Sequence, residues 1–269
     1  MDFTQYVNTN IGTIGHLLLA TAPSVQSPHG AAVVEPVFRA GMKDRFLSDK
    51  IFGFQAGAAV VMPVISGEAP DYMATASSFD HDFEVAKPDH YEVLLEDSGI
   101  REKHTAFHNY GVFKFTYPSA EQSWLVVYVR NCVDYKVEKG LLFVQGKKEF
   151  EHPMTTVLPI GDAEPQVFDI TMPNGHKPEI GESGKAFLIY VNKEVAEIPF
   201  AMSALGFDSA RESFDADVAG KSYEDVLASA RPPGMKFWAR FGSTAAVMPG
   251  SGYSIPRFIA QPAGCTTTA

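Results

Sequence analysis

The chain has 269 residues, of which 45% are apolar and 12% aromatic, a composition typical of a folded globular protein rather than a disordered one. Its formal net charge is −10 and it contains no basic stripe, which excludes an ordinary nucleic-acid-binding surface because phosphate binding requires clustered cations. The first residues include neither a basic segment nor a long apolar one, and the apolar run 17–20 is too short to span a membrane. The sequence therefore indicates a soluble protein without a membrane partner, either cytoplasmic or with a secretion signal outside this sequence.

Nine segments have the composition of β-strands, and glycines and prolines separate them at short intervals. Residues 1–56 show no clear period. Two later segments, 58–65 and 124–130, are almost uniformly apolar, as expected of strands in the middle of a sheet. Residues 112–117 alternate instead, which predicts one buried and one wet face. The other predicted strands are 90–95, 99–107, 141–144, 167–172, 185–191 and 197–202. Regular short strands of this kind indicate a sandwich or a barrel.

One helix is predicted towards the C-terminal end. Ser222 and Asp225 have the spacing of a capping box, and the prolines at 232–233 end the helix. From residue 242 onward the chain is rich in small residues, nearly uncharged and without periodicity. We therefore expect two parts, a β-sandwich domain over 1–231 and a linker remnant or loosely ordered tail over 232–269. The tail also fits a truncated or frameshifted reading frame.

Three segments, taken in order, resemble the N-terminal domain of glycoside hydrolase family 92, a family of α-mannosidases. Residues 74–118 are similar to two of its strands and a Gly-containing hairpin, and residues 209–231 to the segment that leaves its sandwich and enters a linker helix. Residues 6–16, YVNTNIGTIGH, are similar to its opening motif. The matching positions in that motif are Val7, Asn8, Ile11, Gly12, Thr13, Gly15 and His16.

The resemblance implies an all-β fold, an antiparallel β-sandwich of the supersandwich or galactose-mutarotase-like type, with one short C-terminal helix. It implies a parent enzyme in which an (α/α)6 barrel follows the sandwich and hydrolyses α-mannosides with inversion. In such an enzyme the barrel supplies the acid, the base and the calcium site. The chain itself is then expected to hold no catalytic residue and no cofactor, and to be inactive alone. It would brace the barrel and form one wall of the site for a mannose-containing glycan, in the periplasm or outside the cell.

The chain also departs from the family pattern. Residues 17–19 are leucines where the family has a second His and a Pro-Gly-Ala turn after His16. No Trp lies between residues 33 and 51, where a Trp-rich sugar-contacting loop is expected, and Asn109 and Phe113 stand where the family has Arg and His. These differences leave a second hypothesis open, a free-standing carbohydrate-binding or structural sandwich no longer paired with a barrel.

Three residues are candidates for substrate binding. By the resemblance, His16 and His29 flank the interdomain wall and would line a sugar pocket; alternatively, His16 and its neighbouring glycines only shape a turn. Trp238 lies beyond the end of the predicted helix and, if exposed, would stack on a sugar ring together with Tyr253. The alternative for Trp238 is packing against the sandwich.

Four of the eight histidines lie between residues 81 and 108. On an extended strand His104 and His108 share a face, and with His81 and a nearby acid they would form a transition-metal site. The absence of a tight ligand spacing favours ordinary surface and strand-edge histidines, but leaves a small metal-dependent hydrolase as a third hypothesis. The cysteines, Cys132 and Cys265, are far apart and predict two unpaired thiols.

Groups of acidic residues offer candidate acid/base pairs for an inverting glycosidase, which needs two carboxyls facing each other across a water and a sugar. Asp80 and Asp82 flank His81, where a strand would place both acids on one face and a turn would leave both in solvent. The other groups are Glu92 with Glu96 and Asp97, and Glu212 with Asp215 and Asp217.

Overall fold

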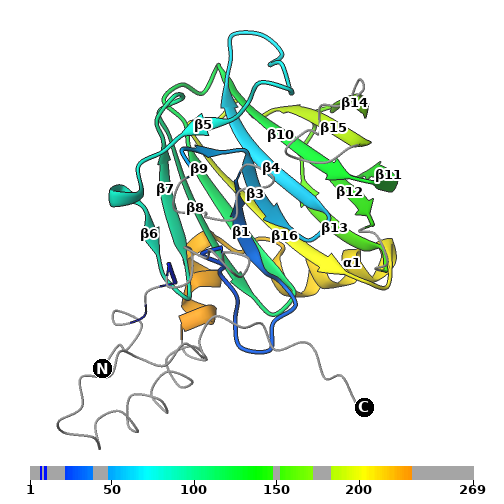
Figure 1. Ribbon diagram of the computed structural model, residues 1–269. Helices are drawn as coiled ribbons and strands as arrows, with labels where there is room; N and C mark the ends of the chain where they lie inside the picture. Colours follow the sequence, from blue (N-terminus) through cyan, green and yellow to red (C-terminus); the bar gives the residue numbers. More distant parts are fainter. Residues whose placement is uncertain are drawn as a thin grey trace, which may run out of the picture.

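Antiparallel pairing organises the β-rich sequence into two large sheets that pack face to face (Figure 1). The computed structural model describes residues 7, 9–10, 22–38, 48–147, 152–171 and 183–231. In these ranges the predicted all-β sandwich is confirmed, and each of the nine predicted strands is present near its expected bounds. None of the helices in the described part of the chain has the length and apolar run needed to cross a bilayer. The predicted tail, 232–269, lies outside the described residues.

The first sheet has six strands, and its two central members are the segments with the most uniformly apolar composition. In order across the sheet they are β1 (Val34–Val37), β3 (Gly53–Ala56), β4 (Ala59–Ile65), β10 (Ser123–Arg130), β15 (Ser183–Tyr190) and β14 (Gln166–Thr171). On β10, Val126 and Val127 point to opposite faces, yet both are fully buried. Strand β10 is therefore covered on both faces, which explains why its sequence does not alternate.

The second sheet has eight strands. In order they are β11 (Cys132–Glu138), β12 (Leu141–Gly146), β13 (Met154–Pro159), β16 (Val195–Ser203), β9 (Tyr110–Thr116), β8 (Ile100–Phe107), β7 (Tyr91–Leu95) and β6 (Val85–Ala86). A separate short pair joins β2 (Lys50–Ile51) to β5 (Ser77–Ser78). A single 3₁₀ turn, η3 (His81–Phe83), precedes β6.

The main core lies between the two sheets and is rich in aromatic rings. Phe54 of β3, Phe187 of β15 and Phe113 of β9 all belong to it, and all three rings are buried. The rings of Phe113 and Phe200, on the paired strands β9 and β16, have centroids 5.1 Å apart. Burying each such side chain contributes about 1.5–3 kcal/mol, so burial of these rings between the sheets stabilises the packing of one sheet on the other.

A second, smaller core lies on the outer face of the eight-stranded sheet, beneath three short helical segments. These are α1 (Phe207–Ser213), the π-helical turn η4 (Phe214–Val218) and a helix over residues 223–231. The predicted capping box is confirmed, because Ser222 Oγ accepts the Asp225 amide while the Asp225 carboxylate accepts from the Ser222 amide. Sequence analysis did not predict α1 and η4.

The alternation in residues 112–117 predicted one wet face, with Lys114 and Thr116 on it. Lys114 and Thr116 do reach solvent, but Val112 on the same face is fully buried in the outer core. The wet face is therefore confirmed at Lys114 and Thr116, and it ends at Val112. Helices that come from a distant part of the sequence cover that end, and the local pattern carries no trace of them.

Several short strands were also missed. Strands β1 and β3 lie in the segment judged to have no period, where Pro36 and Gly53 interrupt short apolar runs. Pro36 is tolerated because β1 is an edge strand. Strand β11 is the opposite case, since it is an edge strand exposed along most of its length and so lacks the apolar composition of a buried strand.

We predict that replacing Phe143 with Ala lowers the free energy of unfolding by about 3–5 kcal/mol. Phe143 is fully buried in the outer core and contacts Phe207 of α1, so the change leaves a cavity between sheet and helices. Urea unfolding followed by circular dichroism measures the effect. The matched control, Val195→Ala at a half-exposed position, should change stability by less than about 0.5 kcal/mol. Equal effects of the two changes would contradict a second core.

Candidate functional site

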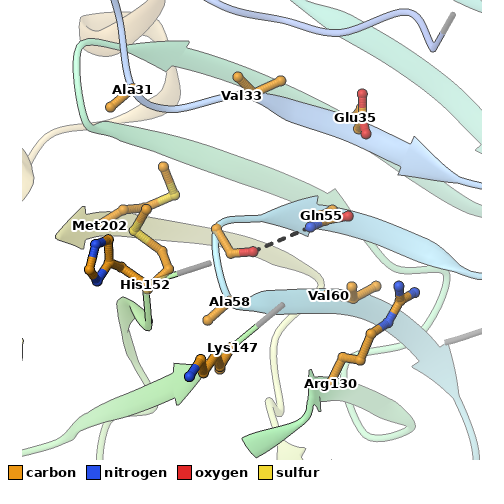
Figure 2. A pocket seen from close by; sticks show the side chains of 13 residues that line it. Ala31, Val33, Glu35, Gln55, Ala58, Val60, Arg130, Lys147, His152 and Met202 are labelled. Carbon is orange, nitrogen blue, oxygen red and sulfur yellow. Dashed lines mark hydrogen bonds between the residues drawn. The ribbon is translucent and has the colours of Figure 1, made fainter. Parts of the chain in front are cut away.

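A pocket of about 330 Å³ lies where one end of the six-stranded sheet meets β12, β13 and β16 (Figure 2). Its polar lining consists of Glu35, Gln55, Arg130, Lys147 and His152. Between these groups lie apolar side chains, among them Val60, Met154 and Met202. An apolar pocket that carries a few converging polar groups is the usual form of a small-molecule site.

Strand register places one side of this pocket. Glu35 is paired with Gln55, and Gln55 with Val60, so the three residues form one row across β1, β3 and β4. Since neighbouring residues alternate, this row faces away from the main core that receives Phe54. Both polar side chains are held in place, because Gln55 Nε2 donates to the Gly57 carbonyl at 3.3 Å and Glu35 accepts from the Ser24 hydroxyl at 2.7 Å.

The turn between β3 and β4 is fixed against the second sheet. Thr156 Oγ1 donates to the Ala56 carbonyl and accepts from the Ala58 amide, both at 3.0 Å. Gly57 between them has φ of 60°, and a Cβ there would lie 2.6 Å from Met202 Sδ. Glycine is therefore required both by the backbone and by the close approach. These contacts fix the position of the turn that forms this wall of the pocket.

The other side of the pocket carries basic side chains from the ends of three strands. Arg130 ends β10, Lys147 follows β12, and His152 precedes β13. Asn131, with φ of 45°, turns the chain between β10 and β11, and its carbonyl accepts from the Lys147 amide at 3.3 Å. Arg130, Lys147 and His152 are exposed, and the side chains of Lys147 and His152 form no ion pair or hydrogen bond with any described residue.

A second polar centre lies at the opposite edge of the eight-stranded sheet, around the buried carboxylate of Glu84. Its Oε1 accepts from Asn10 Nδ2 at 3.0 Å and lies 3.3 Å from His81 Nδ1, and its Oε2 accepts from the Tyr91 hydroxyl at 2.6 Å. His81 Nε2 lies 3.0 Å from the Ser48 carbonyl. Asn10 belongs to the opening motif of the sequence, so Glu84 attaches that motif to the sandwich.

The C-terminal end of the described chain is attached between β6 and β7, at the same edge of the sheet. Arg231, the last described residue of the final helix, donates from Nε to Asp89 Oδ2 at 3.0 Å. Asp89 is buried and also contacts His90. Burial by itself would raise the pKa of Asp89, but the hydrogen bonds from His90 and Arg231 outweigh this effect, so the pKa is lowered overall. The stretch 84–89 therefore holds both the opening motif and the end of the final helix.

One pair of ionisable side chains is enclosed in the core itself. Glu102 and His104 on β8 are both 0% exposed, with 3.0 Å between Glu102 Oε1 and His104 Nδ1. The imidazole is stacked on Tyr91, at 5.2 Å between centroids, and the rings of Phe54 and Phe113 flank it. Among the described residues, Glu102 Oε2 and His104 Nε2 have no hydrogen-bond partner. Burial raises the pKa of Glu102 more than the neighbouring His104 lowers it.

Comparison with known families identifies the domain. The sequence matches the family described as the glycosyl hydrolase family 92 N-terminal domain over residues 6–156, more than half of the chain. The chain belongs to this family. The matched range includes the opening motif, Glu84 and the Glu102–His104 pair, and it confirms the resemblance on which the expected fold was based.

Solved structures of family 92 enzymes share the fold. An inverting mannosidase of family GH92 from Bacteroides thetaiotaomicron is 19% identical with a TM-score of 0.70, covering 89% of this chain and 36% of that one. An α-mannosidase of the same family and species is 18% identical with a TM-score of 0.64, covering 88% and 38%. The GH92 family glycosyl hydrolase ccman5 is 18% identical with a TM-score of 0.70, covering 89% and 37%. This chain thus spans little more than a third of their length. The sequence matches none of the curated proteins.

The residues expected to bind substrate in this family 92 domain are placed as follows. His16 and Trp238 lie outside the described residues, as does Tyr253. His29 is exposed at the tip of a turn with φ of 61°. That turn packs on the β8–β9 turn, because Ser27 Oγ accepts from the His108 amide at 2.9 Å. His29 does not line the pocket of Figure 2.

The predicted histidine group does not assemble. His104 points into the core, whereas His108 lies beyond the end of β8 in a turn with φ of 52°, so the expectation that they share a strand face was wrong. His81 lies in η3 and contacts Glu84 instead. Across the described ranges, no three His, Cys, Asp or Glu side chains gather as metal ligands. Cys132 is a free thiol, and Cys265 lies outside those ranges.

The acidic groups have other partners. Asp80 caps η3 by accepting the Asp82 amide at 2.8 Å, so this segment is a turn and not a strand. Asp97 accepts from Ser78, and Asp215 pairs with Arg211 at 2.6 Å. Glu92 forms ion pairs with Arg101 and Lys103 on the neighbouring strand.

The polar residues of the pocket were not identified from the sequence. Glu35 and Gln55 lie in the segment without period, and Arg130, Lys147 and His152 stand at strand ends, where charged residues are common. No motif connects them. Strand register and the fixed β3–β4 turn bring them together, and neither is visible in a local pattern.

We predict that, relative to the wild type, Glu102→Gln stabilises the protein increasingly as the pH rises above 4.5, the ordinary pKa of a glutamate. The raised pKa means that the folded state binds the Glu102 proton more tightly than the unfolded chain does. Protonated Glu102 therefore contributes stability at low pH, and this contribution is lost as the pH rises through the folded-state pKa. The amide keeps the hydrogen bond to His104 without a titrating proton. Urea unfolding at several pH values measures the difference.

Glu92→Gln is the matched control. The pKa of Glu92 is shifted in the opposite direction, so the effect of this change on stability should vary with pH in the opposite sense. Burial alone would raise the pKa of Glu92, but hydrogen bonds from Lys103 and Arg101 lower it overall. Its stabilising contribution is thus present at neutral pH and is lost as the pH falls through its folded-state pKa, with a magnitude of about 1 kcal/mol or less. Parallel pH profiles for wild type and Glu102→Gln would contradict the account of the buried pair.

Proposed function

We propose that this chain is the sandwich of a family 92-like α-mannosidase, which braces a catalytic barrel and forms one wall of its sugar site. The family match carries the proposal, together with a shared fold that corresponds to 36–38% of the solved enzymes. In this proposal the acid, the base and calcium belong to the barrel, and the sandwich alone does not hydrolyse glycosides. The whole protein would act on mannose-containing glycans in the periplasm or outside the cell.

The way the two ends of the described chain are attached supports a bracing role. Asn10 bonds to Glu84 and Arg231 to Asp89, so a residue of the opening motif and the last described residue of the final helix are both attached at the β6–β7 edge of the sandwich. A barrel docked against this edge would lie beside Asn10 and Arg231. These buried and half-buried polar contacts hold the junction in one orientation.

The carboxyl groups of the described chain also fit a non-catalytic role. Inverting hydrolysis needs two carboxyls about 6.5–9.5 Å apart across a sugar-sized space. Asp80, Asp97 and Asp215 are bound to their own neighbours, and the pocket of Figure 2 has one carboxylate, Glu35. The second acid of a catalytic pair would have to come from elsewhere.

Precipitation with an antibody against this chain tests the proposal. From extracts of its native cells, the precipitate should release mannose from α-linked mannobiose, and chelation of calcium should abolish the release. The purified 29.3 kDa chain alone should release none under the same conditions. Release by the purified chain, or a precipitate rich in this chain without mannosidase activity, would contradict the proposal.

A second candidate function is a free-standing carbohydrate-binding sandwich, which exposed aromatic rings on the outer face of the six-stranded sheet favour. Tyr190 is 42% exposed beside Trp124, and Phe168 is 37% exposed in a stack with Tyr72. Phe168 is paired with Ala186, four residues from Tyr190 on β15, so both rings lie on one face. Aromatic faces of this kind stack on sugar rings.

Calorimetry with α-1,2-mannobiose and the purified chain tests this second function. We expect measurable binding that Tyr190→Ala weakens at least fivefold. The control is Val195→Ala, a half-exposed residue on β16 of the other sheet, which should leave the affinity unchanged. No heat of binding at millimolar sugar would exclude this function.

A further inference from the structure

We propose that strand β11 is a pairing edge for a second copy of this chain, and that the two β11 strands align antiparallel about a two-fold axis at Tyr135. The proposal goes beyond the mannosidase relationship. Strands β11 and β6 are the two opposite edges of the eight-stranded sheet (Figure 1). The pairing edge is therefore separate from the joint at residues 84–89, where a barrel would dock.

The outer side of β11 is open in the described part of the chain. Its single neighbour there is β12, so every second residue of β11 directs its backbone amide and carbonyl away from the sheet. The strand also carries exposed apolar side chains, with Val133 54%, Val137 47% and Tyr135 37% exposed. An exposed edge strand with apolar side chains is a template for pairing with another chain.

The two faces of β11 differ in chemistry. Tyr135 faces the six-stranded sheet, where its ring contacts Phe187 at 5.1 Å between centroids. Lys136 faces the outer core, with its ammonium nitrogen 4.8 Å from the centre of the Phe143 ring. Since strand side chains alternate, the acidic residues two positions before and after Lys136 share its face.

The order of charges along β11 is complementary to itself. In an antiparallel pair centred on Tyr135, Asp134 of each copy stands opposite Lys136 of the other, which gives two opposite-charge pairs. On the other face Val133 of each copy stands opposite Val137 of the other, and the two Tyr135 side chains are neighbours. A second copy thus supplies both the charges and the apolar side chains that this edge requires.

Charge selects this register over the alternatives. A pair centred on Asp134 would set two aspartates against each other, and one centred on Lys136 would do the same with two lysines. A pair centred on Val137 opposes Lys136 to Glu138, but then only residues 136–138 of β11 are paired. Registers centred between two residues would align outward backbone groups with inward ones. The register centred on Tyr135 is the one that pairs the whole strand.

A side chain satisfies one backbone donor of β11 in the single chain. Asp134 Oδ1 accepts from the Tyr135 amide at 2.8 Å. In the proposed dimer this amide donates to the Tyr135 carbonyl of the second copy, and the released carboxylate pairs with Lys136 of that copy. The register with β12 shifts between Cys132 and Asp134, whereas 134–138 pair regularly, so the centre of the proposed interface lies on regular strand.

Sedimentation equilibrium of the full chain tests the proposal. Pairing through one short strand buries little surface, and small interfaces are usually weak. We therefore expect a reversible dimer over a concentration range of about 1–200 µM. The mean mass should rise from that of the 29.3 kDa chain towards twice that value.

Charge variants test the register. Asp134→Lys and Lys136→Asp each replace two opposite-charge pairs with two like-charge pairs, so either change should weaken self-association at least about tenfold. An equimolar mixture of the two variants should associate again, because one then carries two cations at these positions and the other two acids. Lys193→Asp alters the net charge equally at an exposed position outside β11 and should have no effect. Urea unfolding curves that match the wild type show that each variant is folded.

Disulfide cross-linking locates the two-fold axis independently of charge. In a background with Cys132→Ser and Cys265→Ser, Tyr135→Cys should give a covalent dimer on mild oxidation. Residues opposite each other in antiparallel strands have Cα atoms about 4.5–5.5 Å apart, which a disulfide can span. Val137→Cys is the matched control and should cross-link far more slowly, because residue 137 stands opposite Val133 and not opposite itself.

Several results would overturn the proposal. These are a monomer at every concentration, a dimer that persists unchanged in Asp134→Lys, no association in the mixture of the two charge variants, or a Tyr135→Cys variant that cross-links no faster than Val137→Cys. Mannosidase activity in the antibody precipitate does not depend on these outcomes, so the two proposals fail separately.

Discussion

The register of strand β10 is the constraint on which the rest of this structure depends. β10 pairs with β4 on one side and β15 on the other, which sets Val127 between Val61 and Phe187 in the main core. The same register carries Arg130 to the rim of the pocket at the end of the strand. A slip by one residue would turn Val127 out of the core and bring its neighbours in, because strand side chains alternate with a period of two. Core packing and pocket geometry are thus two results of one pairing.

Polar groups inside the sandwich are used in two different ways. Glu84 is buried but fully engaged, with donors from the opening motif, η3 and β7, and such satisfied networks fix one arrangement of the segments they join. The Glu102–His104 pair leaves two buried atoms without partners. Burying unpaired polar atoms costs about 1–3 kcal/mol each, which the surrounding aromatic packing must offset. The first arrangement is a joint between segments, whereas the second is a local source of instability.

Membership of family 92 and the local geometry answer different questions. The family establishes what kind of domain this is, and the solved relatives show the same sandwich as a third or so of a larger enzyme. The chemistry of a particular site must be read from its side chains, because one fold supports many functions. The joint at residues 84–89 bears on the enzyme to which the domain is related, whereas the pocket of Figure 2 is lined by residues of other strands.

Sequence by itself determined the β-sandwich class, the nine main strands, the capping box at Ser222 and the family, because hydrophobic pattern, turn residues and motifs are local properties of the chain. Tertiary structure alone decided that α1 and η4 cover Val112, that His104 is enclosed while His108 is exposed, and that Glu35 lines the same pocket as His152. Each of these depends on which distant segments pack together. That choice is made by strand register and long-range contacts, and short-range periodicity does not encode them.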